Sequence, residues 1–181
     1  TILNAKDDVQ ALVLEMGMRG FGEIARLCAV AKPHIGVVTK VASAHTGRVG
    51  DLDGVARAKS ELVMALDASG FAILNADDDR VVAMQSLTSA RVITYGVAPT
   101  ADVRMTGCVL DERACASVTA ESPWGKASWK MNVPGEHMAH NAVGAIAVAG
   151  IVGLDLQLAA DAISTSILSE MRMQHRIARS G

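Results

Sequence analysis

The stretch "DLDGVARAKSELVMAL" (residues 51–66) is the segment from which the fold of this chain can be predicted. Its apolar residues recur at steps of three and four positions, which is typical of a helix that buries one side. Two apolar runs flank it, "HIGVVTKV" (34–41) and "FAILN" (71–75), and each has the composition of a strand buried on both faces. A strand, a helix and another strand in this order predict a right-handed crossover within a parallel sheet.

The alternation of strand and helix continues on both sides of this crossover. Towards the N-terminus, the sequence predicts a buried strand at "VQALVLEM" (9–16) and a helix at "GEIARLCAVA" (22–31). Towards the C-terminus, it predicts a short helix near 79–87 and a strand at "RVITYG" (91–96). This order favours an open, mostly parallel sheet with helices packed against it.

The pattern changes after Pro99. Three short β runs at 103–110, 114–120 and 126–133 are separated by "DER" and "ESPWG", which predicts an antiparallel meander. Two helices are expected over about 136–168. The expected fold class is therefore α/β: an open, mostly parallel sheet flanked by helices, with a small antiparallel β meander.

Composition narrows the class of protein. The chain has 181 residues and a net charge of −2, so it offers no general attraction to nucleic acid or to an anionic membrane. Its longest apolar run, "AVGAIAVAGIVGL" (142–154), contains three glycines and is too short to span a bilayer, which favours a buried helix. No signal-peptide pattern opens the chain, and the three cysteines lack metal-ligand spacing, so we expect a cytoplasmic protein with reduced thiols.

The helix predicted over 51–66 carries one residue that its pattern does not explain. Lys59 falls in the middle of the apolar side, whereas Asp53, Arg57 and Glu61 lie four residues apart on the other side, where charges typically face solvent. An amine removed from water has a lowered pKa and is more often neutral. A neutral amine can add carbon dioxide to form an anionic carbamate. The alternative is a lysine whose aliphatic stem covers apolar surface while its amine extends to solvent.

Two further polar residues are expected near Lys59. Glu15 ends the predicted strand 9–16, and His45 lies in the loop after the strand 34–41. Because open α/β sheets bind ligands at the carboxyl ends of their strands, we expect Glu15, His45 and Lys59 at one edge of the sheet. A carboxylate, an imidazole and the oxygens of a carbamate, completed by phosphate and water, would suit Mg²⁺.

Nucleotide-binding signals are incomplete in this sequence. The phosphate-loop pattern G-x-x-x-x-G-K-[ST] is absent, so we expect no ATP hydrolysis by these 181 residues alone.

The segment "LNADDD" (74–79) places Asn75 and Asp77 at a strand end, with Asp79 able to cap the next helix. Taken alone, such a segment is more often a helix start than a binding site.

The start of the helix predicted over 137–153 carries polar residues within "PGEHMAHN" (134–141). His137 and Asn141 are four residues apart and therefore share one side of that helix. No cysteine or third ligand lies near His137 and His140 in the sequence, so a zinc site is not expected there.

The order of these segments is more specific than any one of them. "EMGMRGFGEI", "VVTKVASAHTGRVGDLDGVARAKSEL", "LNADD", "GEHMAHNAVGAIAVA" and "RMQ" follow one another along nearly the whole chain, and in this order they resemble the Mur ligase family. The resemblance implies that residues 1–168 are the central ATP-binding domain, of the phosphate-loop type but lacking its first strand and the loop itself. It implies that residues 169–181 are the hinge and the start of a C-terminal domain.

The resemblance also implies roles for single residues. Glu15 and His45 match the magnesium ligands of the family, and Lys59 matches the lysine that is carbamylated to support a second magnesium ion. Arg172 matches a hinge arginine that reaches the nucleotide phosphates. Catalysis is therefore expected to involve Lys59, His45 and Arg172.

A second group of residues matches the nucleotide contacts of the family. Asn75 and Asp77 match the segment near the adenine and ribose, and His137 and Asn141 match the segment whose last Asn contacts adenine. Met138 departs from the pattern, because the family has Asn after the first His, and this part of adenine recognition is therefore in question.

The implied reaction is ATP-dependent amide formation through an acyl phosphate. The "E-M-G…G-E-I" form favours the family member that joins D-alanyl-D-alanine to UDP-N-acetylmuramoyl-tripeptide in peptidoglycan synthesis, with ATP and Mg²⁺ as cofactors. One alternative is another carboxylate–amine ligase of this fold, a sibling Mur ligase or folylpolyglutamate synthase. Another is a non-catalytic nucleotide-binding module.

Overall fold

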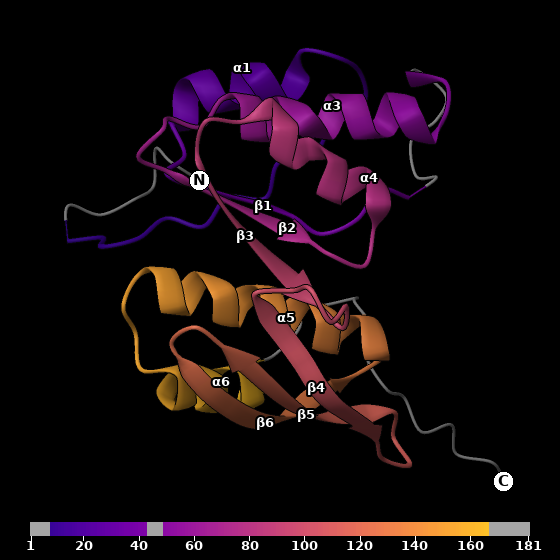
Figure 1. Cartoon of the computed structure of the whole chain (residues 1–181), viewed down its shortest axis with the longest axis vertical. Helices are drawn as coiled ribbons and strands as arrows, with labels where there is room; N and C mark the ends of the chain where they lie inside the picture. Colours follow the sequence, from indigo (N-terminus) through magenta and orange to yellow (C-terminus); the bar gives the residue numbers. More distant parts are fainter. Residues whose placement is uncertain (1–7, 43–48, 167–181) are drawn as a thin grey trace, which may run out of the picture. The chain divides into compact units, whose positions relative to one another are not determined.

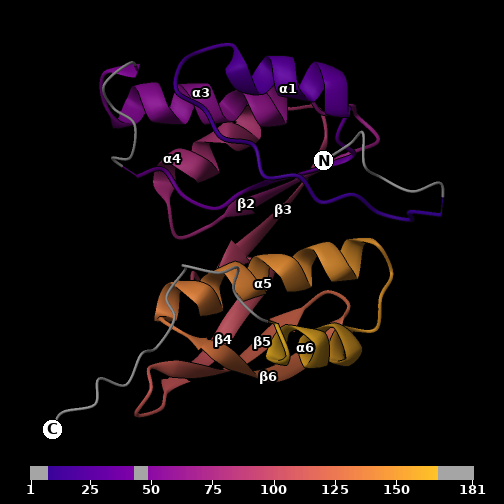
Figure 2. The ribbon, with the colours of Figure 1, turned by 180° about the vertical axis from the view of Figure 1, so that it is seen from behind.

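The computed structural model describes residues 8–42 and 49–166. The chain divides into two compact units: the first contains the described residues up to 74 together with 78–92, and the second contains 75–77 together with those from 93 onward. The chain passes from the first unit to the second within β3 (Arg91–Gly96). Figures 1 and 2 show the elements of each unit from opposite sides.

The first unit contains the predicted crossover. β1 (Ile35–Val38) and β2 (Phe71–Asn75) pair in parallel, with Ile35 opposite Phe71 and Val38 opposite Leu74, and α3 (Leu52–Met64) lies between them in the sequence. The other elements of this unit are α1 (Glu23–Ala31), α4 (Asp79–Val82) and the 3-10 helix η2 (Ala83–Leu87).

Helix α3 forms where the sequence predicts it because its start is capped and one side is apolar. The Asp51 carboxylate accepts a hydrogen bond from the Gly54 amide at 2.8 Å. Val55, Ala58 and Val63 are at most 1% exposed and belong to the core of the first unit. Full burial of each of the two valine side chains stabilises the fold by about 1.5–3 kcal/mol.

The prediction of a buried strand at 9–16 is wrong. This segment has no strand structure, and the Val13 side chain in its middle is 92% exposed. A continuous apolar run forms a strand only where a neighbouring strand satisfies its backbone N–H and C=O groups. Within the described parts of the chain, no strand pairs with this segment.

The prediction that the charged side of α3 faces solvent is confirmed for Asp53 and Arg57, which are exposed, but it is wrong for Glu61, which is half-buried against α1 (Figure 1). The Arg57 guanidinium lies 4.3 Å from the centre of the Phe21 ring. The Glu61 carboxylate accepts hydrogen bonds from the Gly22 amide at 2.6 Å and the Ala25 amide at 3.0 Å. Gly22 precedes α1 and has no side chain to cap it, so Glu61 supplies the missing acceptor.

The second unit contains the predicted meander. Its strands after β3 are β4 (Val103–Leu110), β5 (Cys115–Ser122) and β6 (Gly125–Pro134), and its helices are α5 (Glu136–Ile151) and α6 (Leu156–Ser164). β3 pairs with β4 in parallel, whereas β4, β5 and β6 pair antiparallel, as expected. Alternate residues of β6 are buried on the side of the meander that α5 covers (Figure 2).

Two aromatic rings pack against glycines of α5. A Cβ at Gly144 would lie 3.1 Å from Cζ of Tyr95, and a Cβ at Gly150 would overlap the Trp124 ring, so small residues are needed at both positions. Burial raises the pKa of the Tyr95 hydroxyl, which has no hydrogen-bond partner among the described residues.

No helix in the described part of the chain is long and apolar enough to cross a membrane.

Helix α6 packs beside β6, and one of its side chains is hydrogen-bonded to the backbone of that strand. The Gln157 amide nitrogen donates to the Ser128 carbonyl at 3.0 Å, and the Gln157 oxygen accepts from the Ser128 amide at 3.3 Å. The side chain thus satisfies backbone groups that an edge strand would otherwise offer to another chain.

We expect Gln157→Ala to lower the free energy of unfolding by about 1–2 kcal/mol, because two hydrogen bonds to backbone are lost. The midpoint of urea unfolding measures this change. Gln85→Ala, at an exposed glutamine of η2, serves as the control and should leave the midpoint unchanged. An unchanged midpoint in Gln157→Ala would show that water replaces the glutamine at no cost.

Candidate functional site

The segment 75–77, at the end of β2, has a conformation fixed by hydrogen bonds. The Asn75 side chain is buried, and its oxygen accepts from the Asp77 amide at 2.9 Å. The Ala76 amide donates to the Tyr95 carbonyl at 2.7 Å. Asn75 and Asp77, both predicted nucleotide contacts, therefore lie together in a turn attached to β3.

The Asp77 carboxylate has three nitrogen neighbours, two backbone amides and one imidazole. It accepts hydrogen bonds from the Val97 amide at 3.0 Å and the Ala98 amide at 2.9 Å, in the turn after β3, and Nδ1 of His140 on α5 lies 3.3 Å from its Oδ2. Gly96 has φ +150°, and a Cβ there would overlap this carboxylate, so glycine is required. Asp77 therefore joins the turn after β3 to the start of α5.

The start of α5 presents the other two predicted nucleotide contacts. His137 and Asn141 are exposed and lie one helical turn apart, as their spacing predicts. The His137 ring folds back over Gly135, where a Cβ would overlap the imidazole. The contact between His140 and Asp77 attaches this part of α5 to the segment that carries Asn75.

The helix that follows this segment is capped by Asp78, not by Asp79 as predicted. Asp78 has extended backbone, and its carboxylate accepts from the amides of Arg80 and Val81. Asp79 is already the first helical residue, so its carboxylate lies past the capping position. Asp78 also accepts from the Val41 amide at 2.8 Å, which attaches the loop after β1 to α4.

Lys59 lies on α3 and is half-buried. Burial lowers the pKa of its amine, and the negative charge of Asp78 opposes this shift. Lys59 forms no ion pair with any carboxylate of the described residues. A larger fraction of the amine is therefore neutral than for a lysine in water.

Of the remaining predicted catalytic and metal-binding residues, only Glu15 lies within the described part of the chain. Glu15 is exposed and precedes α1. His45 and Arg172 lie outside the described residues. Among the residues that the structure describes, no three His, Cys, Asp or Glu side chains are grouped closely enough to hold a metal ion.

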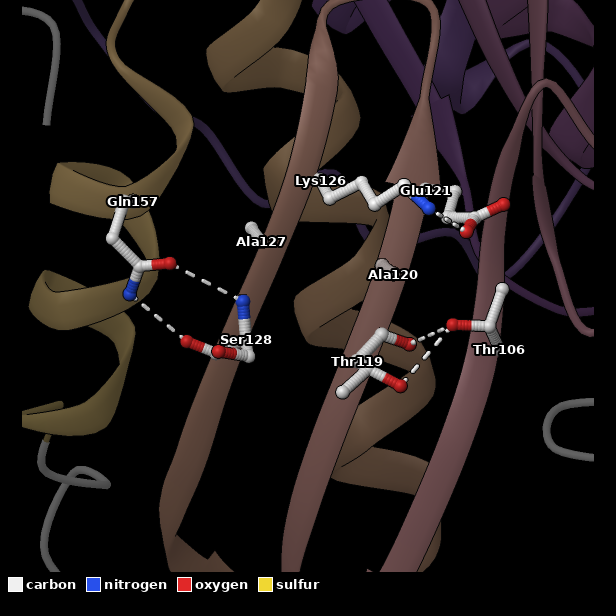
Figure 3. Close-up of a pocket in the computed structure, with 8 residues that line it drawn as sticks. All are labelled: Thr106, Thr119, Ala120, Glu121, Lys126, Ala127, Ser128 and Gln157. Atoms are coloured by element: carbon white, nitrogen blue, oxygen red, sulfur yellow. Dashed lines mark hydrogen bonds and ion pairs between the residues drawn. The ribbon is translucent and has the colours of Figure 1, made fainter.

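A shallow hollow on the open face of the meander contains none of the predicted site residues (Figure 3). Its polar groups satisfy one another: Lys126 pairs with Glu121 at 2.6 Å, and the hydroxyls of Thr106 and Thr119 are 3.1 Å apart. Gln157 borders it from α6. Because these groups are already paired, we assign no function to the hollow.

Comparison with known sequences decides the class of protein. Residues 1–149 match the Mur ligase middle domain. The chain belongs to the Mur ligase family. It is 39% identical over 175 residues to a UDP-N-acetylmuramoyl-tripeptide–D-alanyl-D-alanine ligase of Mycobacterium tuberculosis, a match that covers 96% of this chain and 34% of that protein. The same ligase of Escherichia coli is 31% identical over 159 residues, which are 86% of this chain and 35% of that protein.

Solved structures of this family have the same fold. A MurF structure from Acinetobacter baumannii matches with a TM-score of 0.91 and 25% identity over 98% of this chain and 39% of that one. MurF from Thermotoga maritima, solved in complex with ADP, matches with a TM-score of 0.78 and 17% identity over 91% of this chain and 38% of that one. These matches confirm the predicted fold class. The Mur ligase chain described here spans about a third of the length of these curated relatives.

Two residues with clear contacts were not predicted by sequence reasoning. The sequence pattern marks His140 only as one of two histidines where no zinc site is expected, and Glu61 only as a solvent-facing charge. Their acceptor and donor partners lie far away in the sequence, and no short-range spacing signals such contacts.

Proposed function

We propose that this chain is the nucleotide-binding part of an ATP-dependent ligase that joins D-alanyl-D-alanine to UDP-N-acetylmuramoyl-tripeptide in the synthesis of peptidoglycan precursors. The observation that carries the proposal is the 39% identity over 96% of the chain to ligases with this name. We also propose that residues 1–168 belong to the central ATP-binding domain, that 169–181 belong to the hinge after it, and that the protein is cytoplasmic.

In the proposed reaction, the tripeptide carboxylate takes the γ-phosphoryl group of ATP, and the amine of D-alanyl-D-alanine then displaces phosphate from the acyl phosphate. Magnesium, when bound, lowers the repulsion between the carboxylate and the polyphosphate. Glu15 and His45 would hold it through a carboxylate oxygen and a ring nitrogen, and Lys59 would do so through carbamate oxygens. The half-buried position of Lys59 supports this role, because only a neutral amine forms a carbamate. Arg172 would contact the phosphates.

Adenine and ribose would bind where the segment 75–77 meets the start of α5. The exposed positions of His137 and Asn141 on one side of α5 support this placement. Asn75 and Asp77 would support the site from the end of β2, and the paired carboxylate of Asp77 favours a role in shaping it.

The experiment that tests the proposal measures phosphate release from ATP by the protein expressed from its complete gene. We expect release only when UDP-N-acetylmuramoyl-tripeptide and D-alanyl-D-alanine are both present. Turnover with L-alanine or glutamate as the amine would instead indicate a sibling ligase or folylpolyglutamate synthase. Nucleotide binding without turnover would indicate a non-catalytic module.

We expect Asn141→Ala to raise the KM for ATP by a factor that corresponds to about 1–3 kcal/mol, because the Asn side chain offers adenine a donor and an acceptor. Steady-state kinetics with ATP as the varied substrate measure this effect. Asn132→Ala, at an exposed asparagine of β6, is the control and should leave the KM unchanged. Unchanged ATP kinetics in a folded Asn141→Ala protein would remove Asn141 from the site.

A further inference from the structure

The contact between His140 and Asp77 involves a residue to which the family motifs assign no role. Nδ1 of His140 lies 3.3 Å from Oδ2 of Asp77. The two side chains are only 27% and 19% exposed, so water competes weakly for this contact. A neutral imidazole with its proton on Nδ1 donates a hydrogen bond to the carboxylate, and a protonated imidazole donates one as well.

Each partner of this contact holds a different part of the candidate site. The Asp77 carboxylate also accepts from the amides of Val97 and Ala98, so it fixes the turn after β3. His140 lies on α5 between His137 and Asn141, whose side chains are exposed. A displacement of α5 at His140 would therefore move both exposed side chains relative to the segment 75–77.

Asp77 is poorly suited to be a direct ribose ligand in this arrangement. Its carboxylate already accepts hydrogen bonds from two backbone amides, and Nδ1 of His140 lies 3.3 Å from one of its oxygens. A carboxylate occupied in this way is more useful as a fixed acceptor that orients neighbouring groups than as a free acceptor for a ligand hydroxyl.

We propose that His140 is a positioning residue of the nucleotide site, which acts through Asp77 to hold the His137–Asn141 side of α5 in its binding position. This inference rests on the proposed function, since it requires that the protein binds ATP. His140 touches no reacting atom in this proposal, so it affects nucleotide affinity and not the chemical step.

The variants that test the proposal differ in where they place a donor. In His140→Asn, the amide nitrogen is as many bonds from the backbone as Nδ1 of histidine, so it can still donate to Asp77. In His140→Gln, the amide nitrogen is one bond further away, and in His140→Ala there is no donor. His34→Ala changes an exposed histidine in the first unit and serves as the control.

The measurements are the dissociation constant of magnesium-ATP, by titration calorimetry, and the KM and kcat of the protein expressed from its complete gene. We expect His140→Ala to raise the dissociation constant and KM about tenfold while kcat changes less than about twofold. His140→Asn should recover to within about threefold of the wild type, and His140→Gln should resemble His140→Ala. In an Asp77→Asn background, His140→Ala should have little further effect, because the two residues act as a pair.

The proposal is overturned if His140→Ala lowers thermal stability but leaves ATP affinity unchanged, since the contact is then structural only. It is also overturned if His140→Asn is as impaired as His140→Ala, or if the effects of His140→Ala and Asp77→Asn are additive. Failure of the wild type to bind ATP would instead overturn the proposed function, so the two failures are distinguishable.

Discussion

Replacement of Lys59 by arginine should abolish ligase activity without unfolding the protein, with kcat reduced about 100-fold or more at saturating ATP and magnesium. Arginine keeps the positive charge and the aliphatic stem but cannot form a carbamate, so it supplies no oxygen ligand. Lys59→Ala should be equally damaging. Steady-state kinetics of the protein expressed from its complete gene, together with circular dichroism of each variant, provide the test.

The alternative role of Lys59 makes the opposite prediction. A lysine that only extends its amine to solvent needs a stem and a cation, and arginine provides both. A kcat of Lys59→Arg within a few-fold of the wild type would therefore exclude the carbamate. Lys126→Arg, at an exposed lysine of β6, controls for the substitution itself. Removal of carbon dioxide should lower wild-type activity, and added bicarbonate should restore it if the carbamate exchanges.

Replacement of Glu61 by alanine should destabilise the first unit by about 2–4 kcal/mol, because two hydrogen bonds from the start of α1 to a charged acceptor are lost. The donors are the amides of Gly22 and Ala25, and among the described residues no other side chain accepts from them. In Glu61→Gln, the side-chain oxygen can still accept one of the two hydrogen bonds, but the side-chain NH2 group faces the other backbone N–H. The loss of stability should therefore be smaller than in Glu61→Ala.

Thermal unfolding by circular dichroism measures the loss, and hydrogen exchange locates it. The amides of α1 should lose protection before those of α3. Glu112→Ala, at an exposed glutamate between β4 and β5, is the matched control and should change stability by less than about 0.5 kcal/mol. Equal stability of Glu61→Ala and the control would show that water caps α1 as well as the carboxylate does.

The elements of this chain could be predicted wherever local pattern and tertiary environment agree. β2 and β3 begin and end at the predicted residues, because each run is bounded by turn-forming or polar residues. The segment 9–16 has the same apolar character as β2, yet it forms no strand in the described structure. An apolar pattern shows only that a segment can be buried. A strand also needs a neighbouring strand to pair with, and that neighbour lies elsewhere in the sequence.

The candidate site could be predicted only in part, for a related reason. Asn75, Asp77, His137 and Asn141 are predicted as nucleotide contacts from local motifs, and the structure places the first two in one turn and the last two on one side of α5. The capping of α1 by Glu61 and the contact of His140 with Asp77 depend on long-range packing. A one-residue shift in a helix start, as between Asp78 and Asp79, likewise depends on backbone angles that composition does not specify.

The uneven distribution of aromatic residues determines how this protein can be observed in solution. Trp124, Trp129 and Tyr95 all belong to the second unit, whereas the first unit contains only Phe21 and Phe71. Intrinsic tryptophan fluorescence therefore comes from residues of the second unit alone. Melting curves followed by fluorescence and by far-ultraviolet ellipticity will coincide only if both units unfold in one cooperative step. The ring of Trp124 rests on Gly150, near the end of α5 that lies opposite to His137 and Asn141, so its fluorescence reports on the packing of that helix end.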